Sequence, residues 1–202
     1  MKKQIYRQLR VYRYVFYRET LVDPREHFWS FVGAFVGIFT IAFTQSLHLP
    51  LLENVFLIGS FGASSVLVYG AIQSPLAQPR NLVGGHVVSA FVGVTVARLF
   101  PDIIWLTAPL AVASSIVFMQ MTRTLHPPGG ATALIAVTGG TKVASLGYWY
   151  VLNPVLFGAL ILLLTALVFN NITAKRHYPV KYSRLRRSRR RHLKAKRLGG
   201  RG

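Results

Sequence analysis

The sequence predicts an all-α polytopic membrane protein, and three observations lead to this expectation. Of the 202 residues, 52% are hydrophobic and only 14% are charged, and the mean hydropathy is +0.40. Several apolar runs approach the roughly 20 residues that a helix needs to cross a bilayer. The basic residues gather at the two ends of the chain. An ordinary soluble domain does not combine these properties, so the chain is placed in the membrane class.

The formal net charge of +19 comes mostly from the chain ends. Residues 1–27 hold seven Lys and Arg, residues 175–202 hold thirteen and no acid, and the 147 residues between them hold four. We therefore expect a basic segment over 1–23, a membrane domain over 24–174 and a polybasic tail over 175–202. The tail shows no hydrophobic periodicity, which predicts a disordered segment attracted to anionic lipid headgroups.

The first part of the chain suits a basic amphipathic helix lying on an anionic membrane surface. Apolar residues recur there at spacings of three and four, between arginines; a frayed basic leader is the alternative. Asp23 can then cap a helix that has Pro24 in its first turn, so we expect a helix to start near residue 24. No small-residue cleavage site follows the first apolar run, which is therefore expected to be a retained span.

The number of crossings follows from the apolar runs and the charges. Runs of bilayer length fall at 28–46, 54–73, 82–100, 103–121 and 150–170, and a shorter, interrupted run falls at 127–145. Because Lys and Arg are enriched in cytoplasmic loops, both basic termini are expected to be cytoplasmic, which requires an even number of crossings. The 127–145 run then becomes a broken fifth span of six, in a cell (inner) membrane. If that run were only re-entrant, the basic tail would lie outside.

Two short motifs suggest an inverted three-plus-three repeat. "GASSVLV" (62–68) and "GATALIA" (130–136) each start with small residues, continue with aliphatic ones and occupy the middle element of a three-span half. Interrupted segments at corresponding positions of two such halves indicate a midplane binding site. Small residues are also common wherever membrane helices pack closely, so packing is the alternative explanation.

The run after residue 126 has the composition of an anion site. Pro127 and Pro128 cannot donate backbone hydrogen bonds, so a helix beginning near Pro128 could leave amides free at its positive end. These amides belong to Gly129, Gly130, Ala131 and Thr132, and Gly62, Ser64 and Ser65 could add donors from the other half. The alternative is that the glycines permit close packing and the prolines only end a helix.

Two histidines are the titratable candidates within the apolar body. His86 lies in "NLVGGHVVSA" and His126 precedes the prolines; they could form a proton or substrate relay, or each could simply satisfy a hydrogen bond. A metal site is disfavoured because no carboxylate or third histidine accompanies them at ligand spacing, and no cofactor is expected. Arg80 and Arg123, near the expected cytoplasmic ends of spans, either reach lipid phosphates or draw anions toward a vestibule.

Three motifs resemble the HPP family of integral membrane proteins, named for His126, Pro127 and Pro128. They are "GSFGASSVLV" (59–68), "SPLAQPRNLVGGH" (74–86) and "TRTLHPPGGATALIAV" (122–137), and the resemblance covers roughly 24–172. It implies a small polytopic protein described as having four spans, with a transport role and with plastid and cyanobacterial relatives linked to nitrite. The four-span description differs from the six expected from the charges.

We expect a channel or secondary transporter for a small monovalent anion, with nitrite suggested by the resemblance, using the helix starts at 129–132 and 62–65. The alternative is a non-transporting scaffold whose basic ends bind anionic lipid or protein partners. An enzyme is not expected, because the chain has five acids, none deep in a span, and no interpretable Ser/His spacing. Small residues such as Gly33 and Gly37 would permit a homo-oligomer. No specific nucleic-acid partner is expected.

Overall fold

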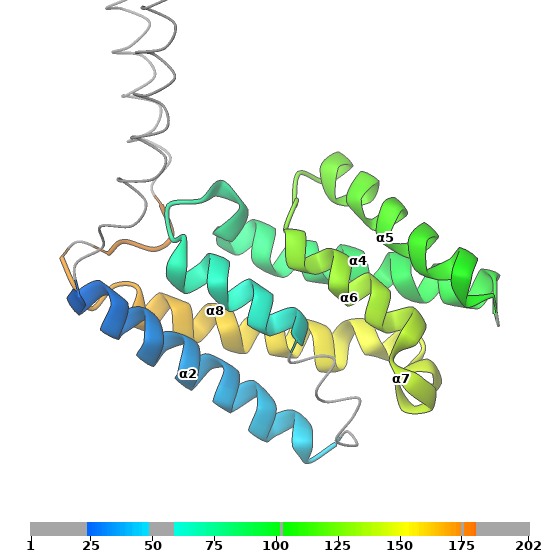
Figure 1. The fold of residues 1–202 in the computed structure, drawn as a ribbon, viewed down its shortest axis with the longest axis horizontal. Helices are drawn as coiled ribbons and strands as arrows, with labels where there is room; N and C mark the ends of the chain where they lie inside the picture. The colour runs from blue at the N-terminus through cyan, green and yellow to red at the C-terminus, as the bar shows by residue number, and fades with distance from the viewer. Residues whose placement is uncertain (1–23, 49–58, 102, 175, 181–202) are drawn as a thin grey trace, which may run out of the picture.

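In a computed structural model, residues 24–48, 59–101, 103–174 and 176–180 are described, and within them the chain is helical without a strand (Figure 1). The fold is therefore all-α, as predicted. Its elements are α2 (Pro24–Ser46), a helix over residues 59–70 that ends in η1 (Val66–Gly70), η2 (Pro75–Ala77), α4 (Pro79–Leu99), α5 (Ile104–Met121), α6 (Pro127–Thr138), α7 (Gly140–Leu146), η3 (Val151–Leu156) and α8 (Phe157–Phe169). The basic segment 1–23 and residues 181–202 of the tail lie outside the described residues.

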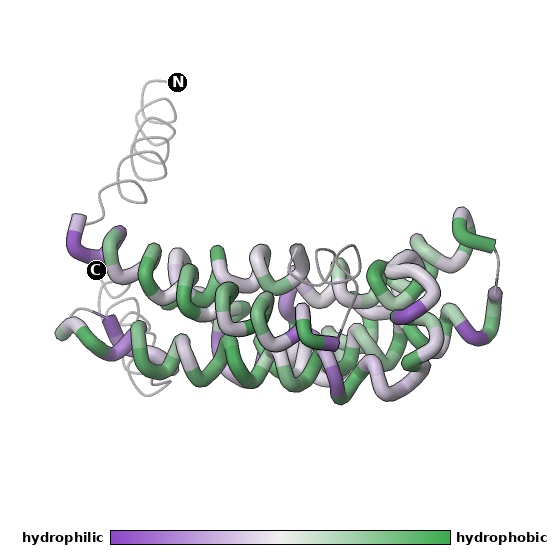
Figure 2. Tube along the Cα trace, turned by 90° about the horizontal axis from the view of Figure 1, so that it is seen from below, coloured by the Kyte–Doolittle hydropathy of each residue, from purple (hydrophilic) through white to green (hydrophobic). Residues whose placement is uncertain are grey.

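Four helical stretches of the described residues are long and apolar enough to cross a membrane. They are Pro24–Ser46, Pro79–Leu99, Ile104–Met121 and Val151–Phe169, and Figure 2 shows α2 apolar along its length and hydrophilic at its start. This confirms a polytopic membrane protein. With 12 residues, α6 is too short to cross by itself, and α7 follows it after a break at Gly139. Four is the number that the family resemblance implies; six crossings, counting 59–70 and α6–α7, stay a prediction.

Prolines begin three of the α-helices. Pro24 starts α2, Pro79 starts α4 and Pro127 starts α6. A proline fits this position because the first amides of a helix have no partner inside it and because the ring fixes a helical φ. The start predicted near residue 24 is confirmed, and α6 begins one residue before the predicted Pro128.

The central helix α4 packs against α5, α6 and the helix that contains η3, while α2 packs against α8. Small residues bring α4 and α6 into backbone contact. A Cβ added to Gly93 would lie 2.6 Å from the Ala133 carbonyl oxygen, and one added to Gly129 would lie 2.7 Å from Ser89 Oγ. Larger side chains at these glycines would separate the helices, so the glycines fix how deeply α6 sits against α4.

Two of the helix pairs correspond to one another in the way that an inverted repeat predicts. The first long helix, α2, packs on α8, and its counterpart in the second half, α5, packs on α4. The two middle elements, residues 59–70 and α6, touch through Ser60 and Thr132, whose hydroxyl oxygens are 2.7 Å apart. Shared ancestry of the halves stays a prediction.

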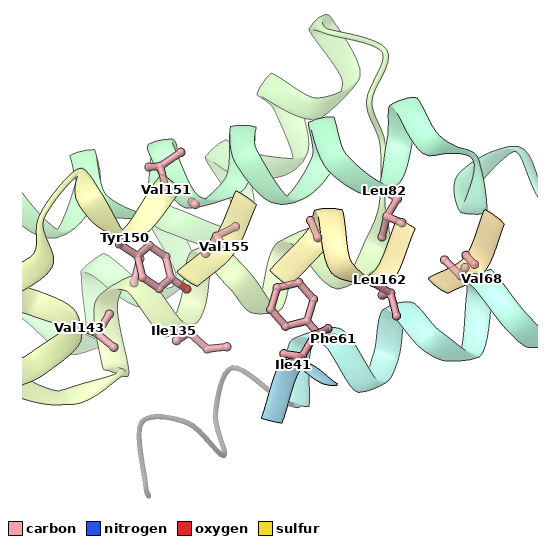
Figure 3. Close-up of a cluster of buried hydrophobic side chains, with 14 of the residues drawn as sticks. Ile41, Phe61, Val68, Leu82, Ile135, Val143, Tyr150, Val151, Val155 and Leu162 are labelled. Carbon is pink, nitrogen blue, oxygen red and sulfur yellow. The ribbon is translucent and has the colours of Figure 1, made fainter. Parts of the chain in front are cut away.

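The apolar core and the outward face of α2 differ in how exposed their aromatic side chains are. Phe61, Tyr150, Leu162 and Ile41 are almost fully buried in one cluster (Figure 3). On α2, a ladder of phenylalanines one turn apart is stacked ring on ring and more than half exposed: Phe31, Phe35, Phe39 and Phe43. We assign this ladder to the lipid, since lipid solvates apolar side chains as well as a protein core does.

The packed body continues past residue 174, beyond the boundary predicted from composition. Arg176 and Tyr178 are only 4% and 2% exposed, so the residues described at 176–180 belong to the folded body and not to a disordered tail. The Arg176 guanidinium also lies 3.4 Å from the Glu26 carboxylate at the start of α2. The two ends of the helical body therefore lie together.

Candidate functional site

His126 is carried into the body by a short non-helical segment between α5 and α6. Its backbone is extended (φ −141°, ψ 105°), and Gly85 on α4 has no side chain that would collide with it. Gly85 is six residues into α4, which places His126 about 9 Å along that helix from its start. Within this segment Thr124 and His126 are buried and Leu125 is half-buried, and the Leu125 carbonyl accepts from Asn81 Nδ2 at 2.7 Å. Non-helical backbone in a membrane protein needs such protein partners, because lipid offers none.

His126 and His86 meet at a single hydroxyl group. Ser64 Oγ lies 2.7 Å from His86 Nε2 and 2.9 Å from His126 Nε2, and the two ring centroids are 5.1 Å apart. All three side chains have no exposed surface. The sequence separated these residues by 22 and 62 positions, and packing of the 59–70 helix against α4 and α6 brings them together.

The series of hydrogen-bonding contacts continues from the other ring nitrogen of His86. Its Nδ1 lies 2.7 Å from Thr132 Oγ1, which lies 2.7 Å from Ser60 Oγ. We call the five side chains Ser60, Thr132, His86, Ser64 and His126 the histidine chain. At its end, His126 Nδ1 lies 2.8 Å from the Leu76 carbonyl oxygen. Among the described residues no three His, Cys, Asp or Glu side chains come together. The contacts of the two imidazoles are with hydroxyl groups and with one carbonyl oxygen.

With both imidazoles neutral, one arrangement of hydrogens uses every contact between successive members of the histidine chain and the contact with the Leu76 carbonyl. A carbonyl only accepts, so His126 carries its proton on Nδ1 and donates to Leu76; its Nε2 then accepts from the Ser64 hydroxyl. Ser64 has only that one proton, so His86 Nε2 must donate to Ser64 Oγ. Continuing back, His86 Nδ1 accepts from Thr132 and Thr132 accepts from Ser60. All hydrogen bonds therefore point the same way, from Ser60 toward Leu76.

The same atoms can hold one additional proton. If His126 is protonated on Nε2, Ser64 Oγ can accept from both imidazoles with its two lone pairs. The Ser64 proton then turns to the Ser60 carbonyl oxygen, 3.3 Å away. No contact of His126 is lost in this second arrangement, but a positive charge is left in an enclosed site. Such a charge would favour a nearby anion.

The predicted free amides at the start of α6 are largely absent, which corrects the expectation of a helix-terminus anion site there. Two of the first positions are prolines, which have no N–H, and the Gly129 amide donates to the His126 carbonyl at 2.8 Å. From Gly130 onward, amides of a regular α-helix bond to the carbonyl four residues earlier. The His-Pro-Pro sequence therefore closes the helix start and positions the His126 ring.

The remaining predicted site residues contribute no side chain to the histidine chain, although the Pro128 carbonyl oxygen lies 3.3 Å from Ser60 Oγ. Ser65 is buried without a partner for its hydroxyl group. Arg80 and Arg123 are exposed, and Arg80 donates to the Thr122 carbonyl at 2.7 Å, at the end of α5. Among the other members of the predicted set, Pro128 and Gly129 are buried in helix packing, whereas Pro127 is exposed and Gly62, Gly130 and Ala131 are half-buried.

Three groups that complete the site were not predicted from the sequence. Ser60 precedes Ser64 by one helical turn, and this spacing could have indicated that both hydroxyl groups share a face. The Leu76 carbonyl and the Tyr150 hydroxyl, which donates to the Thr132 carbonyl at 3.0 Å, left no local pattern. Their contribution depends on how distant segments pack.

Comparisons with known proteins agree with this fold. The family model described as "HPP, transmembrane region" matches residues 19–179. Two transmembrane proteins of Dictyostelium discoideum are similar: one is 47% identical over 78% of this chain and 51% of its own length, and the other is 45% identical over 81% and 58%. The chain thus spans little more than half of each of these relatives. No solved structure matches it. The chain belongs to the HPP family of transmembrane proteins, and the histidine of its His126-Pro127-Pro128 sequence is one of the buried pair.

Proposed function

We propose that this chain is a secondary transporter that carries a small monovalent anion across a membrane together with a proton, and that the histidine chain is its coupling site. The observation that carries the proposal is the single hydroxyl of Ser64 between two fully buried imidazoles. Ionisable residues inside a membrane domain are costly and usually mark a substrate or proton path.

Coupling between the two ions would follow from charge. In the neutral arrangement the hydrogen bonds of the chain are satisfied, and an anion gains little by approaching. After proton uptake, the positive His126 attracts an anion, and the pair has no net charge to move through the apolar body. Arrival of one ion thus favours arrival of the other. This replaces the helix-terminus mechanism, because the α6 start offers few free amides.

The choice of nitrite as the first substrate to test comes from the family resemblance. The environment of the proposed site is a cell (inner) membrane with anionic lipid and with both termini on the cytoplasmic side. We further propose that the chain is not an enzyme and can assemble with copies of itself.

The proposal is tested in proteoliposomes. Uptake of nitrite, nitrate, formate, chloride and bicarbonate is measured with and without an inward proton gradient, alongside the internal pH. We expect gradient-dependent uptake of at least one of these anions, with proton entry in fixed ratio to the anion. Anion flux that is independent of the proton gradient would indicate a channel, and no flux of any anion would refute transport.

A scaffold role is the second candidate, because the basic residues are concentrated at the two chain ends. It predicts no flux in sealed vesicles, and loss of function when residues 181–202 alone are removed. Transport retained by that truncated chain would favour the transporter.

A further inference from the structure

A second polar region lies at the end of the bundle away from Arg176. Two cavities of about 360 and 240 Å³ share the lining side chains of Gln45, His48 and Asn153. We call these cavities together the Gln45 pocket. It is formed where α2 ends and where η3 is interrupted by the non-helical Asn153 (φ −132°, ψ 117°). The residues expected to bind an anion from sequence include none of this lining.

The pocket is equipped to hold a small hydrated anion. Lys142 lines the smaller cavity and supplies positive charge, and His48 and Asn153 can donate hydrogen bonds. Gln45 is 3% exposed; its Nε2 is 3.4 Å from the Pro154 carbonyl oxygen, and its buried Oε1 has no partner. Because Oε1 only accepts, a water that accompanies the anion is the natural group to satisfy it.

One aromatic ring separates this pocket from the histidine chain. A Cβ added to Gly158 would lie 2.6 Å from Phe61 Cζ and 3.1 Å from Gln45 Nε2, so the ring edge and the Gln45 amide meet at that glycine. The other side of the Phe61 ring faces His86, with centroids 4.9 Å apart. Phe61 is 1% exposed and lies beside Ile41 and Leu162 (Figure 3).

We infer that the Gln45 pocket is an entry vestibule for a small monovalent anion and that Phe61 is the gate between this vestibule and the histidine chain. This inference rests on the proposed transport function for the identity of the ligand. The order Gln45, Phe61, His86 gives a path in which a single side-chain movement joins the vestibule to the coupling site. Because Gly158 has no side chain, the Phe61 ring has space there that a Cβ atom of any other residue would occupy.

The absence of cysteine from the chain permits a direct test by thiol labelling. Asn153→Cys places a thiol in the vestibule, and Ser60→Cys places one beyond the gate. Each is treated in proteoliposomes with a charged thiosulfonate reagent. Phe35→Cys, on the lipid face, is the control that should stay unlabelled. We expect Asn153→Cys to react and Ser60→Cys to stay protected. Protection of Asn153→Cys, or equal labelling of both, would overturn the inference.

The gate is tested by truncating the ring. Labelling of a buried thiol follows the population of open conformations, so Phe61→Ala should raise the labelling rate of Ser60→Cys by about tenfold or more. Phe61→Val, a smaller truncation, should raise it less and serves if the alanine variant is poorly folded. Phe61→Leu, which keeps the bulk, is the matched control and should leave the thiol protected. An unchanged rate in both smaller variants would show that Phe61 is not the gate.

The ligand class is tested separately from transport. Sodium nitrite should slow the labelling of Asn153→Cys, and sodium sulfate at equal ionic strength should slow it less. Equal slowing by both salts would overturn a site for monovalent anions. Because labelling needs no net flux, a labelling pattern as expected together with absent uptake would support the vestibule and gate while refuting the proposed transporter.

Discussion

The histidine chain and the Arg176 cluster, which consists of Arg176 and its hydrogen-bond acceptors, are both buried and polar. The histidine chain is neutral in its first arrangement, whereas the Arg176 cluster holds a permanent charge. The histidine chain is satisfied without a charge, and its hydroxyl hydrogens can turn to a second arrangement. Arg176 keeps a permanent charge, because a guanidinium does not lose its proton in proteins. Burial lowers its pKa, and the charge of Glu26 opposes that shift. One cluster can therefore change its protonation and the other cannot.

The Arg176 cluster is fixed by many acceptors at once. Its two terminal nitrogens donate to Glu26, Ser30 and Asn170 and to the Tyr69 carbonyl, at 2.7 to 3.4 Å. These acceptors come from α2, from the end of η1 and from the end of α8. A charge held by several elements stabilises one arrangement of the bundle, whereas a hydroxyl between two imidazoles permits two. Burial of polar groups thus serves rigidity in the Arg176 cluster, and we propose that it serves proton movement in the histidine chain.

Replacing Ser64 tests the histidine chain and should have the largest effect on transport. Ser64→Ala removes the donor to His126 and the acceptor for His86, so proton-coupled anion uptake should fall by about 100-fold, the range of a lost acid–base group. Ser64→Thr keeps a hydroxyl group and should retain much more flux. The measurement is initial uptake in proteoliposomes at matched protein content. Normal coupled uptake by the alanine variant would remove the histidine chain from the mechanism.

Replacing Arg176 tests the Arg176 cluster. Arg176→Met should lower the free energy of unfolding by about 3 kcal/mol, because it leaves buried acceptors and Glu26 without their partner. Thermal unfolding in detergent, followed by circular dichroism, gives the change. Arg176→Lys keeps the charge but not the forked donors, so it should recover only part of the loss. A stability equal to that of the unmodified protein would show that the cluster is not a clamp.

Two neighbouring glycines at the start of α6 differ in how closely they pack against other helices, so replacing each one tests the role of that packing. Gly129→Ala should destabilise the protein by about 1–3 kcal/mol, because its Cβ would press on Ser89 and α4. Gly130→Ala meets only Val112 Cγ1 at 3.7 Å and should be neutral or stabilising by up to about 1 kcal/mol. Unfolding of the two variants is compared side by side. Equal loss in both would mean that the close approach of α4 and α6 is not what places His126.

Tyr178 follows Arg176 by two residues and reaches the segment that ends the histidine chain, and its change should be the smallest. Its hydroxyl donates to the Ala77 carbonyl at 2.8 Å, next to the Leu76 carbonyl that accepts from His126 Nδ1. Tyr178→Phe should cost about 1 kcal/mol of stability. Uptake should fall slightly, with the proton-to-anion ratio unchanged. A changed ratio would show that the end segment tunes coupling as well as stability.

Some features could be predicted because they depend on local chain properties. Composition and run lengths predicted a polytopic all-α protein, and the prolines predicted helix starts near residues 24 and 128, within a residue of the observed ones. His86 and His126 could be singled out, because an ionisable group in an apolar run is unusual whatever the fold. The break between α6 and α7 lies at Gly139 and was not predicted.

The sequence by itself thus determined that the chain is a membrane protein, where several of its helices begin and which of its residues are chemically unusual. Only the tertiary structure decided that Ser64 is shared by the two histidines, that the Gly129 amide is taken by His126, and that Arg176 belongs to the folded body. The physical reason is that helix starts depend on neighbouring backbone atoms, whereas a hydrogen bond between residues 22 or 62 positions apart depends on how helices pack.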